Sequence, residues 1–220
     1  MKFLFCLIFL LLGLGSTFAQ NPTIKVLDTD FSKGRLNKTT ILTLEDVGKF
    51  HGHLCDGLAL GFMGLREGLS MLYPDSIIDR TNTRIVSKSS PCITDIAIYL
   101  TGARYQYNSF YVSDSIPYLF IVQRKDNSKT IGIKLKPGIK PYAIDSLGKL
   151  ANDGRLSACE LNSLKKLEDE FTQYILQTNP KEIFVLVEIT DFNWDPKLSN
   201  SFIKTDIINK AKSNCEGKNH

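Results

Sequence analysis

The stretch TRIVSKSSPCITDIAIYL, residues 83–100, predicts a strand that leads into a helix. The β-branched run Thr83–Ser87 is typical of a strand, and Ser89-Ser90-Pro91 separates it from the next segment. From Cys92 to Leu100, apolar side chains recur on one side at helical spacing. A strand followed directly by a helix is an element of sheets that are covered by helices.

The segments on either side continue this alternation. Further helices are expected where apolar residues recur at helical spacing, at residues 57–72, 144–151 and 157–177. Further strands are expected at residues 109–112, at 183–187, and as an antiparallel pair at 118–123 and 130–135. The continuous apolar run 183–187 suits a central strand, whereas residues 21–41 predict a leader segment with one edge strand. Because helices and strands interleave, we expect an α+β fold with a mixed β-sheet flanked by helices.

Two local patterns predict how helices begin and pack. Thr43 followed by Asp46 resembles a capping box, which predicts a short helix through Val47 and Phe50. The helix at 57–72 carries glycines at 57, 61, 64 and 68, each of which costs about 1 kcal/mol relative to alanine. A strand or a partner helix should therefore pack closely against that face.

The N-terminus has the pattern of a cleaved export signal. Lys2 precedes the apolar run Phe3–Leu14, which is short for a bilayer span, and Thr17-x-Ala19 then fits a signal-peptidase site. We expect residues 1–20 to be a signal peptide cleaved after Ala19 or Gln20, with a secreted or periplasmic product. A retained N-terminal anchor is the alternative.

Composition excludes several function classes. With 27 basic and 23 acidic residues among 220, the charge is too weak and scattered to predict nucleic-acid binding. No later segment is long and apolar enough for a membrane span. After cleavage the cysteines are Cys55, Cys92, Cys159 and Cys215; Cys159 and Cys215 should be peripheral to the chemistry and could pair in a disulfide.

The run His51-Gly52-His53-Leu54-Cys55 is the strongest chemical signal in the chain. It holds two of only three histidines, with a cysteine two positions beyond the second. Imidazole and thiolate are ligands that zinc prefers. In an extended stretch, residues two apart project to one side, so His51, His53 and Cys55 could face one metal. A following helix start should lower the pKa of Cys55. The alternative is that both histidines are surface residues and Cys55 is a buried apolar residue.

A second helix start supplies a candidate fourth ligand. Cys92 follows Pro91, and Asp95 lies three residues further on. Cys92 is expected to join the metal site, bringing its sulfur to within about 4 Å of that of Cys55. Asp95 is a candidate catalytic residue. The alternatives are a core cysteine and an acid that complements the helix dipole.

Both motifs resemble those of the FmdE family, which takes its name from formylmethanofuran dehydrogenase. Residues 50–61, FHGHLCDGLALG, are similar to its first signature, and residues 92–102, CITDIAIYLTG, to its second. The resemblance implies a thioredoxin-like α+β core and an active site able to hold zinc. The export signal argues against a role in an intracellular methanofuran enzyme.

Three functions are hypotheses at this point. The first is an exported enzyme that uses Zn²⁺ or another divalent transition metal on a small molecule, with redox chemistry as one option, in which His51 is a ligand or a proton donor. The second is a non-catalytic metal or cofactor carrier, and the third is a thiol–disulfide protein using Cys55 and Cys92. The expected organisation is a domain over residues 21–194 and a tail over 195–220 with a possible helix at 200–212, and a homodimer is possible.

Overall fold

The computed structural model describes residues 21–31 and 34–196, and this part of the chain has the expected α+β fold. Its larger sheet has the strand order β5-β4-β6-β7-β8. The bounds are β4 (Thr83–Ser87), β5 (Phe110–Val112), β6 (Phe120–Arg124), β7 (Thr130–Leu135) and β8 (Phe184–Glu188). β4 and β5 run parallel and the other pairs antiparallel, so the sheet is mixed as predicted. The helix α3 (Pro91–Thr101) makes the crossover between the two parallel strands.

A second, three-stranded sheet was not predicted. Its order is β2-β1-β3, with β1 (Thr23–Thr29), β2 (Leu36–Thr43) and β3 (Ile77–Asp79). The expectation of one edge strand in residues 21–41 is wrong, because β1 and β2 pair antiparallel along their length. Ile24 and Val26 of β1 are buried while Thr23 and Lys25 are exposed, so the hairpin covers the core with one face.

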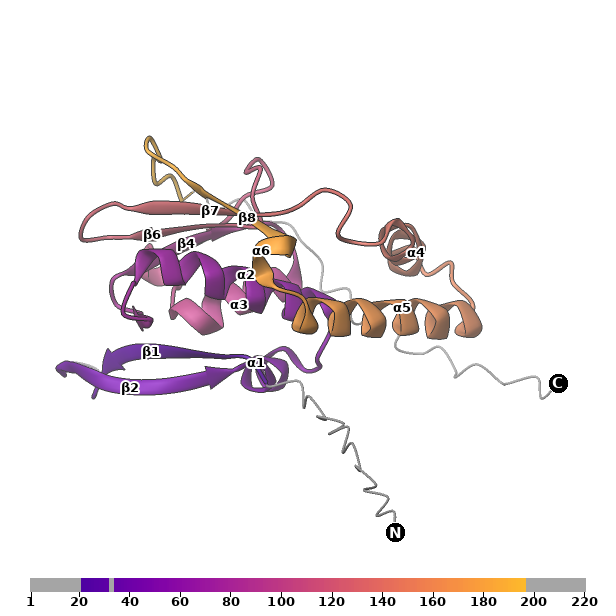
Figure 1. Ribbon diagram of the computed structural model, residues 1–220, viewed down its shortest axis with the longest axis horizontal. Helices are drawn as coiled ribbons and strands as arrows, with labels where there is room; N and C mark the ends of the chain where they lie inside the picture. Colours follow the sequence, from indigo (N-terminus) through magenta and orange to yellow (C-terminus); the bar gives the residue numbers. More distant parts are fainter. Residues whose placement is uncertain (1–20, 32–33, 197–220) are drawn as a thin grey trace, which may run out of the picture.

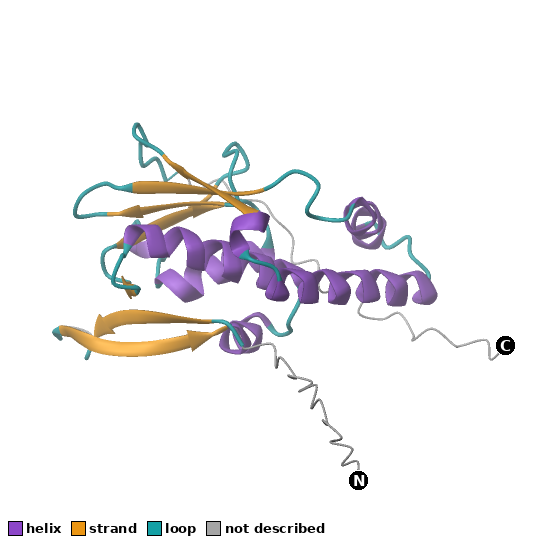
Figure 2. Cartoon of the chain, in the orientation of Figure 1, coloured by secondary structure: helices purple, strands orange, loops and turns teal. Residues whose placement is uncertain are grey.

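Two helices lie between the sheets and pack on each other and on the larger sheet (Figures 1 and 2). These are α2 (Asp56–Leu72) and α3. The other helices are α1 (Leu44–His51), α4 (Tyr142–Asn152), α5 (Ala158–Gln177) and α6 (Pro180–Ile183), with a 3-10 turn at Tyr105–Tyr107. The capping box at Thr43 and Asp46 is present at the start of α1, and Ser157 and Glu160 form another at the start of α5.

The glycines of α2 allow the close packing that the sequence predicted. A Cβ at Gly61 would lie 3.2 Å from Ile96 of α3. A Cβ at Gly64 would lie 2.8 Å from Phe184 of β8, and one at Gly68 would meet Ile133 of β7. One helix therefore packs on a partner helix and on the sheet, which offsets the propensity lost at each glycine.

The strand β8 lies at the edge of its sheet and not at the centre. It pairs with β7 alone among the described strands, and Val185 is 39% exposed. The prediction of a central strand is wrong because the residues of the apolar run lie in different environments. Ile183 ends α6, and Phe184 packs into the main core. Elsewhere on this sheet, a small apolar cluster of Val86, Tyr111 and Ile121 is covered by residues that include Phe192 and Trp194.

The helices α4 and α5 form an arm, much of which projects beyond the sheets (Figure 1). They pack on each other, and α5 also packs on α2. No helix in the described part of the chain is long and apolar enough to cross a membrane. The expected signal peptide, the possible helix at 200–212 and Cys215 lie outside the described residues.

Candidate metal centre

Three helix ends meet at the candidate site, which we call the junction. The helix α1 ends at His51, and Gly52 then takes a left-handed conformation with φ of 107°. Cys55 is the N-cap of α2, and Cys92 follows the proline that begins α3. The three helices pack on one another, so residues far apart in sequence come together here.

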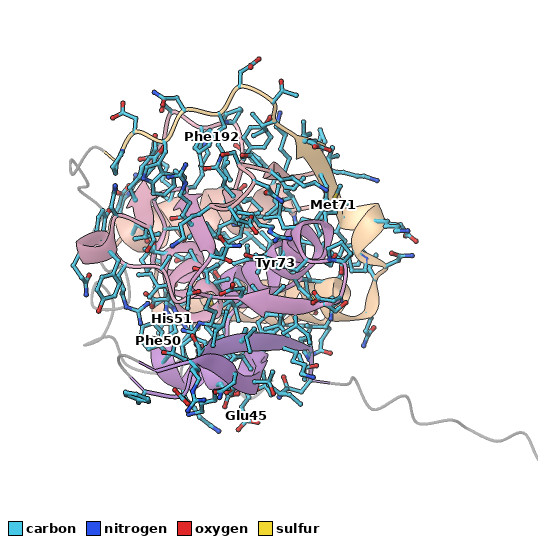
Figure 3. The ribbon with its side chains drawn as sticks, turned by 90° about the vertical axis from the view of Figure 1, so that its left-hand side faces the viewer. Glu45, Phe50, His51, Met71, Tyr73 and Phe192 are labelled. Carbon is cyan, nitrogen blue, oxygen red and sulfur yellow. The ribbon has the colours of Figure 1, made fainter. Side chains whose placement is uncertain are left out.

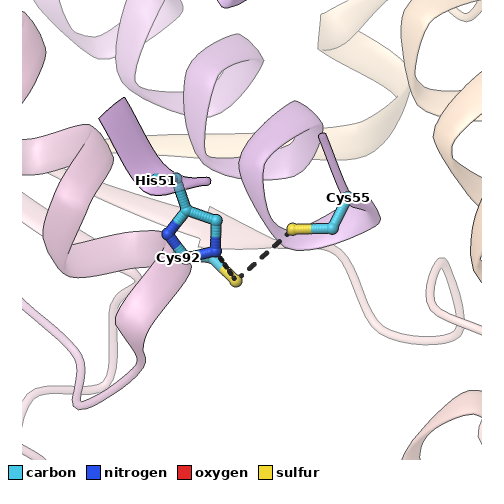
Figure 4. A group of neighbouring side chains, drawn as sticks. All are labelled: His51, Cys55 and Cys92. Atoms are coloured by element: carbon cyan, nitrogen blue, oxygen red, sulfur yellow. Dashed lines mark hydrogen bonds between the residues drawn. The ribbon is translucent and has the colours of Figure 1, made fainter. Parts of the chain in front are cut away.

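His51, Cys55 and Cys92 converge at the junction (Figure 4). The two Sγ atoms are 3.5 Å apart, within the separation expected from the sequence. The Sγ of Cys92 lies 3.7 Å from Nε2 of His51. All three donor atoms lie within 4.8 Å of one another, so a single ion could contact all of them.

Asp95 fixes the orientation of the His51 ring. Its Oδ2 lies 2.7 Å from Nδ1 of His51, and because a carboxylate only accepts, Nδ1 is the donor. Nε2 is then left to face the sulfurs. The His51 side chain is 1% exposed and that of Asp95 is 31% exposed, so the pair connects a buried imidazole to the surface. Asp95 thus contacts His51 and is not itself one of the three clustered residues.

The ionisable groups of the junction influence one another strongly. The hydrogen bond to the Cys55 sulfur and then that to Asp95 outweigh burial and raise the pKa of His51 from 6.5 to about 9. The pKa of Cys55 is raised, first by its hydrogen bond with the Cys92 sulfur and then by burial. The expectation of a lowered Cys55 pKa is therefore wrong, because the favourable backbone N–H of Leu58 is a smaller influence.

His53 does not join the cluster. Its side chain is exposed, and its ring centroid lies 4.7 Å from that of His51. The sequence argument assumed an extended stretch, but His51 is helical and Gly52 is left-handed, so residues two apart do not share a side.

The neighbouring Phe50 is 51% exposed and packs on Tyr99, with 5.4 Å between ring centroids. Figure 3 places Phe50 and His51 near the three-stranded sheet and Phe192 on the opposite side of the molecule.

Gly57 makes room for the Cys92 sulfur, a role that the sequence did not predict. A Cβ at this position would lie 2.9 Å from both Cβ and Sγ of Cys92. The glycines of α2 were a signal of close packing, but only the fold shows that one of them faces a candidate ligand.

Glu168 of the arm is a second residue that sequence reasoning missed. Burial and then the negative charge of Asp56 raise its pKa from 4.5 to about 7. Asp56 directly follows Cys55, so the arm brings a second carboxyl group towards the start of α2. Nothing in the pattern of α5 distinguishes Glu168 from its acidic neighbours, because its setting depends on tertiary packing.

One comparison with known proteins finds a family whose model spans these residues. A family model described as "FmdE, Molybdenum formylmethanofuran dehydrogenase operon" matches residues 50–185. The match covers more than half of the chain and includes all three clustered residues and Asp95. No curated protein matches the sequence.

Proposed function

We propose that the chain, which belongs to the FmdE family, is an exported protein that binds a divalent transition metal through His51, Cys55 and Cys92. We further propose that the metal is zinc and that the protein is an enzyme acting on a small molecule. The observation that carries the proposal is the convergence of two sulfurs and one imidazole nitrogen within 4.8 Å.

The donor set fits zinc in kind and in spacing. Thiolate and imidazole are ligands of zinc and of other borderline-soft metals. Ligands in a tetrahedral zinc site lie about 3.5–4 Å from one another at ordinary bond lengths. The measured separations of 3.5 Å between the sulfurs and 3.7 Å between sulfur and nitrogen are therefore compatible with it. A carboxylate on the far nitrogen of a histidine ligand is a common support for such a site.

Among the described residues three donors converge, and a site with three protein ligands favours catalysis. Structural zinc sites use four protein ligands, whereas catalytic sites use three and keep a position for water or substrate, with Cys₂His among the sets found. A zinc ion held here would polarise a substrate oxygen or lower the pKa of a bound water. Asp95 would hold the His51 ring in one orientation, and the exposed His53 ring beside it is accessible to a substrate.

A non-catalytic carrier is the second candidate, because Cys55 and Cys92 are only half-buried. Partial exposure favours exchange of a metal with another molecule. A carrier should release its metal to a chelator within minutes, while an enzyme should retain it and turn over a substrate.

Export is supported by the leader pattern of residues 1–20 and by the state of Cys159. This residue is disulfide-bonded, which suits an oxidising compartment. Sequencing of the N-terminus of exported protein should return Gln20 or Asn21. Recovery of Met1 would contradict the cleavage.

Elemental analysis of protein purified from its native compartment tests the proposed function. Wild-type protein should contain one metal ion per chain, and the Cys55→Ser variant should contain much less. The His53→Ala variant is the matched control and should keep its metal. Folded wild-type protein that carries no metal, and takes up none from added zinc, would contradict the proposal.

A further inference from the structure

We propose that Cys55 and Cys92 form a reversible disulfide when the junction holds no metal, so that metal binding and disulfide formation exclude each other. Only this exclusion rests on the proposed function. The disulfide itself depends on the two thiols alone.

The geometry of the two sulfurs carries the inference. Their Sγ atoms are 3.5 Å apart although the residues are 37 positions apart in sequence. A disulfide bond is about 2.05 Å long, so the sulfurs must approach by about 1.5 Å. Cys55 is an N-cap with extended backbone, and Cys92 lies in the first turn of α3, so neither sits in a helix interior. Side-chain rotation can bring the sulfurs together while the hydrogen bonds of both helices persist.

The surroundings of the pair allow a small disulfide to reach it. Both cysteines are half-buried, so a molecule such as glutathione disulfide has access. Nε2 of His51 lies 3.7 Å from Sγ of Cys92, close enough for its N–H to stabilise the Cys92 thiolate. Gly57 leaves space beside Cys92 that any larger residue would fill.

The exchange takes two balanced steps. The Cys92 thiolate attacks one sulfur of glutathione disulfide, forming a mixed disulfide and releasing one glutathione thiolate, which takes up the proton from Cys92. The Cys55 sulfur then attacks the Cys92 sulfur, forms the bond between the two cysteines and releases the second glutathione, which takes up the proton from Cys55. The two protein thiols lose two electrons, and glutathione disulfide gains them.

The product no longer offers thiolate ligands. Metal binding requires thiolates, and neither sulfur of a disulfide carries that charge. Conversely, a bound ion occupies both sulfurs and withdraws them from exchange. The oxidised pair would also join the starts of α2 and α3 covalently, at a point where the two helices already pack.

The experiment treats the full exported chain, stripped of metal by a chelator, with glutathione disulfide. Intact mass and non-reduced peptide mapping are then measured. Wild-type protein should lose the mass of two hydrogen atoms and yield a peptide that links Cys55 to Cys92. The Cys55→Ser and Cys92→Ser variants should each stop at one stable glutathione adduct. The His53→Ala variant should behave as wild type, and circular dichroism should show that every variant is folded.

Adding one equivalent of zinc before the oxidant tests the exclusion. Zinc should slow disulfide formation in wild type by at least about tenfold, in line with the loss of available thiolate. It should slow the reaction much less in the His51→Ala variant, which keeps both thiols.

The outcomes separate the two proposals. If zinc binds in calorimetry but stripped protein ends with two glutathione adducts or stays reduced, the disulfide inference is overturned and the metal site stands. If the disulfide forms and zinc does not bind, the proposed function and the exclusion fail while the disulfide stands. If zinc binds and the disulfide forms at an unchanged rate, the exclusion alone is overturned.

Discussion

Cysteines and ion pairs occur both at the junction and in the arm, but they differ in burial and in bonding. At the junction, Cys55 and Cys92 are half-buried thiols beside a buried histidine, whereas Cys159 of the arm is exposed and disulfide-bonded. Ion pairs in the arm, such as Lys166 with Glu170 at 3.8 Å, are exposed and contribute little to stability. In the pair of His51 and Asp95, the imidazole is 1% exposed and the Asp95 side chain is 31% exposed. Burial and convergence, more than residue type, therefore distinguish a candidate reactive site.

The largest effect should come from removing a sulfur at the junction but not in the arm. Loss of a supporting residue weakens metal binding by about 10- to 100-fold, so loss of a ligand in Cys92→Ser should cost at least about 100-fold. The double variant Cys159→Ser, Cys215→Ser should bind zinc as wild type does. Competition with a chromophoric chelator measures both affinities. A folded double variant without metal would show that the arm contributes to the site.

The two histidines give a contrast within the junction itself. His51→Ala should weaken zinc binding by about 100-fold or more, because it removes both a ligand and the link to Asp95. His53→Ala should change the affinity by less than about threefold, since its side chain is exposed and outside the cluster. The same chelator competition applies. Equal losses in the two variants would mean that His53 moves in to bind the metal.

Asp95→Asn tests the support of the histidine ligand. Asparagine keeps the shape of the side chain but removes the charge that holds Nδ1–H of His51. Zinc affinity should fall by about 10- to 100-fold, with the fold unchanged by circular dichroism. An unchanged affinity would leave Asp95 with a role only in the helix.

Glycine-to-alanine changes should have opposite effects on the free energy of unfolding in the two regions. A Cβ at Gly57 would lie 2.9 Å from the Cys92 sulfur, so Gly57→Ala should destabilise the protein by about 1–3 kcal/mol. Gly148 of α4 has nothing within 4 Å of its Cβ position, so Gly148→Ala should stabilise by about 1 kcal/mol. Urea denaturation measures both free energies of unfolding. Stabilisation by both changes would mean that the junction is looser than the structure indicates.

A pH dependence of stability is also expected in protein stripped of metal. Folding raises the pKa of His51 from 6.5 to about 9, so the folded state holds this proton more tightly. The resulting stabilisation is fully present below about pH 6.5 and is lost as the pH rises through about 9. Between these limits, wild type should lose on the order of 3 kcal/mol relative to His51→Ala in urea denaturation. A constant difference between the two proteins would contradict the raised pKa.

Local signals made much of the fold predictable from the sequence. The capping box at Thr43 and Asp46 and the strand Thr83–Ser87 agree with the structure, because turn chemistry and β-branched runs act over a few residues. The hairpin of β1 and β2 was missed because β2 is mostly exposed and polar, with no apolar alternation to indicate a strand.

The site was only partly predictable, for a related reason. Ligand chemistry and the family resemblance pointed to Cys55 and Cys92. The contact of His51 with Asp95 joins residues 44 positions apart, and no local pattern encodes it. His53 lies outside the cluster because one left-handed residue, Gly52, changes the direction of the side chains after it.

The wide sequence separation of the donors has a consequence for how the protein folds. His51 and Cys55 are neighbours along the chain, so an unfolded chain could hold an ion with these two alone. The third donor, Cys92, arrives only when the 37-position loop from Cys55 has closed and α3 has docked on α2. Loop-closure entropy opposes that step in the free chain. An ion already bound by His51 and Cys55 would favour the step, because docking adds the third bond between ion and ligand. Three-donor coordination would therefore mark the moment of helix docking, and time-resolved spectroscopy with a coloured ion such as Co²⁺ in place of the d¹⁰ Zn²⁺ could follow it.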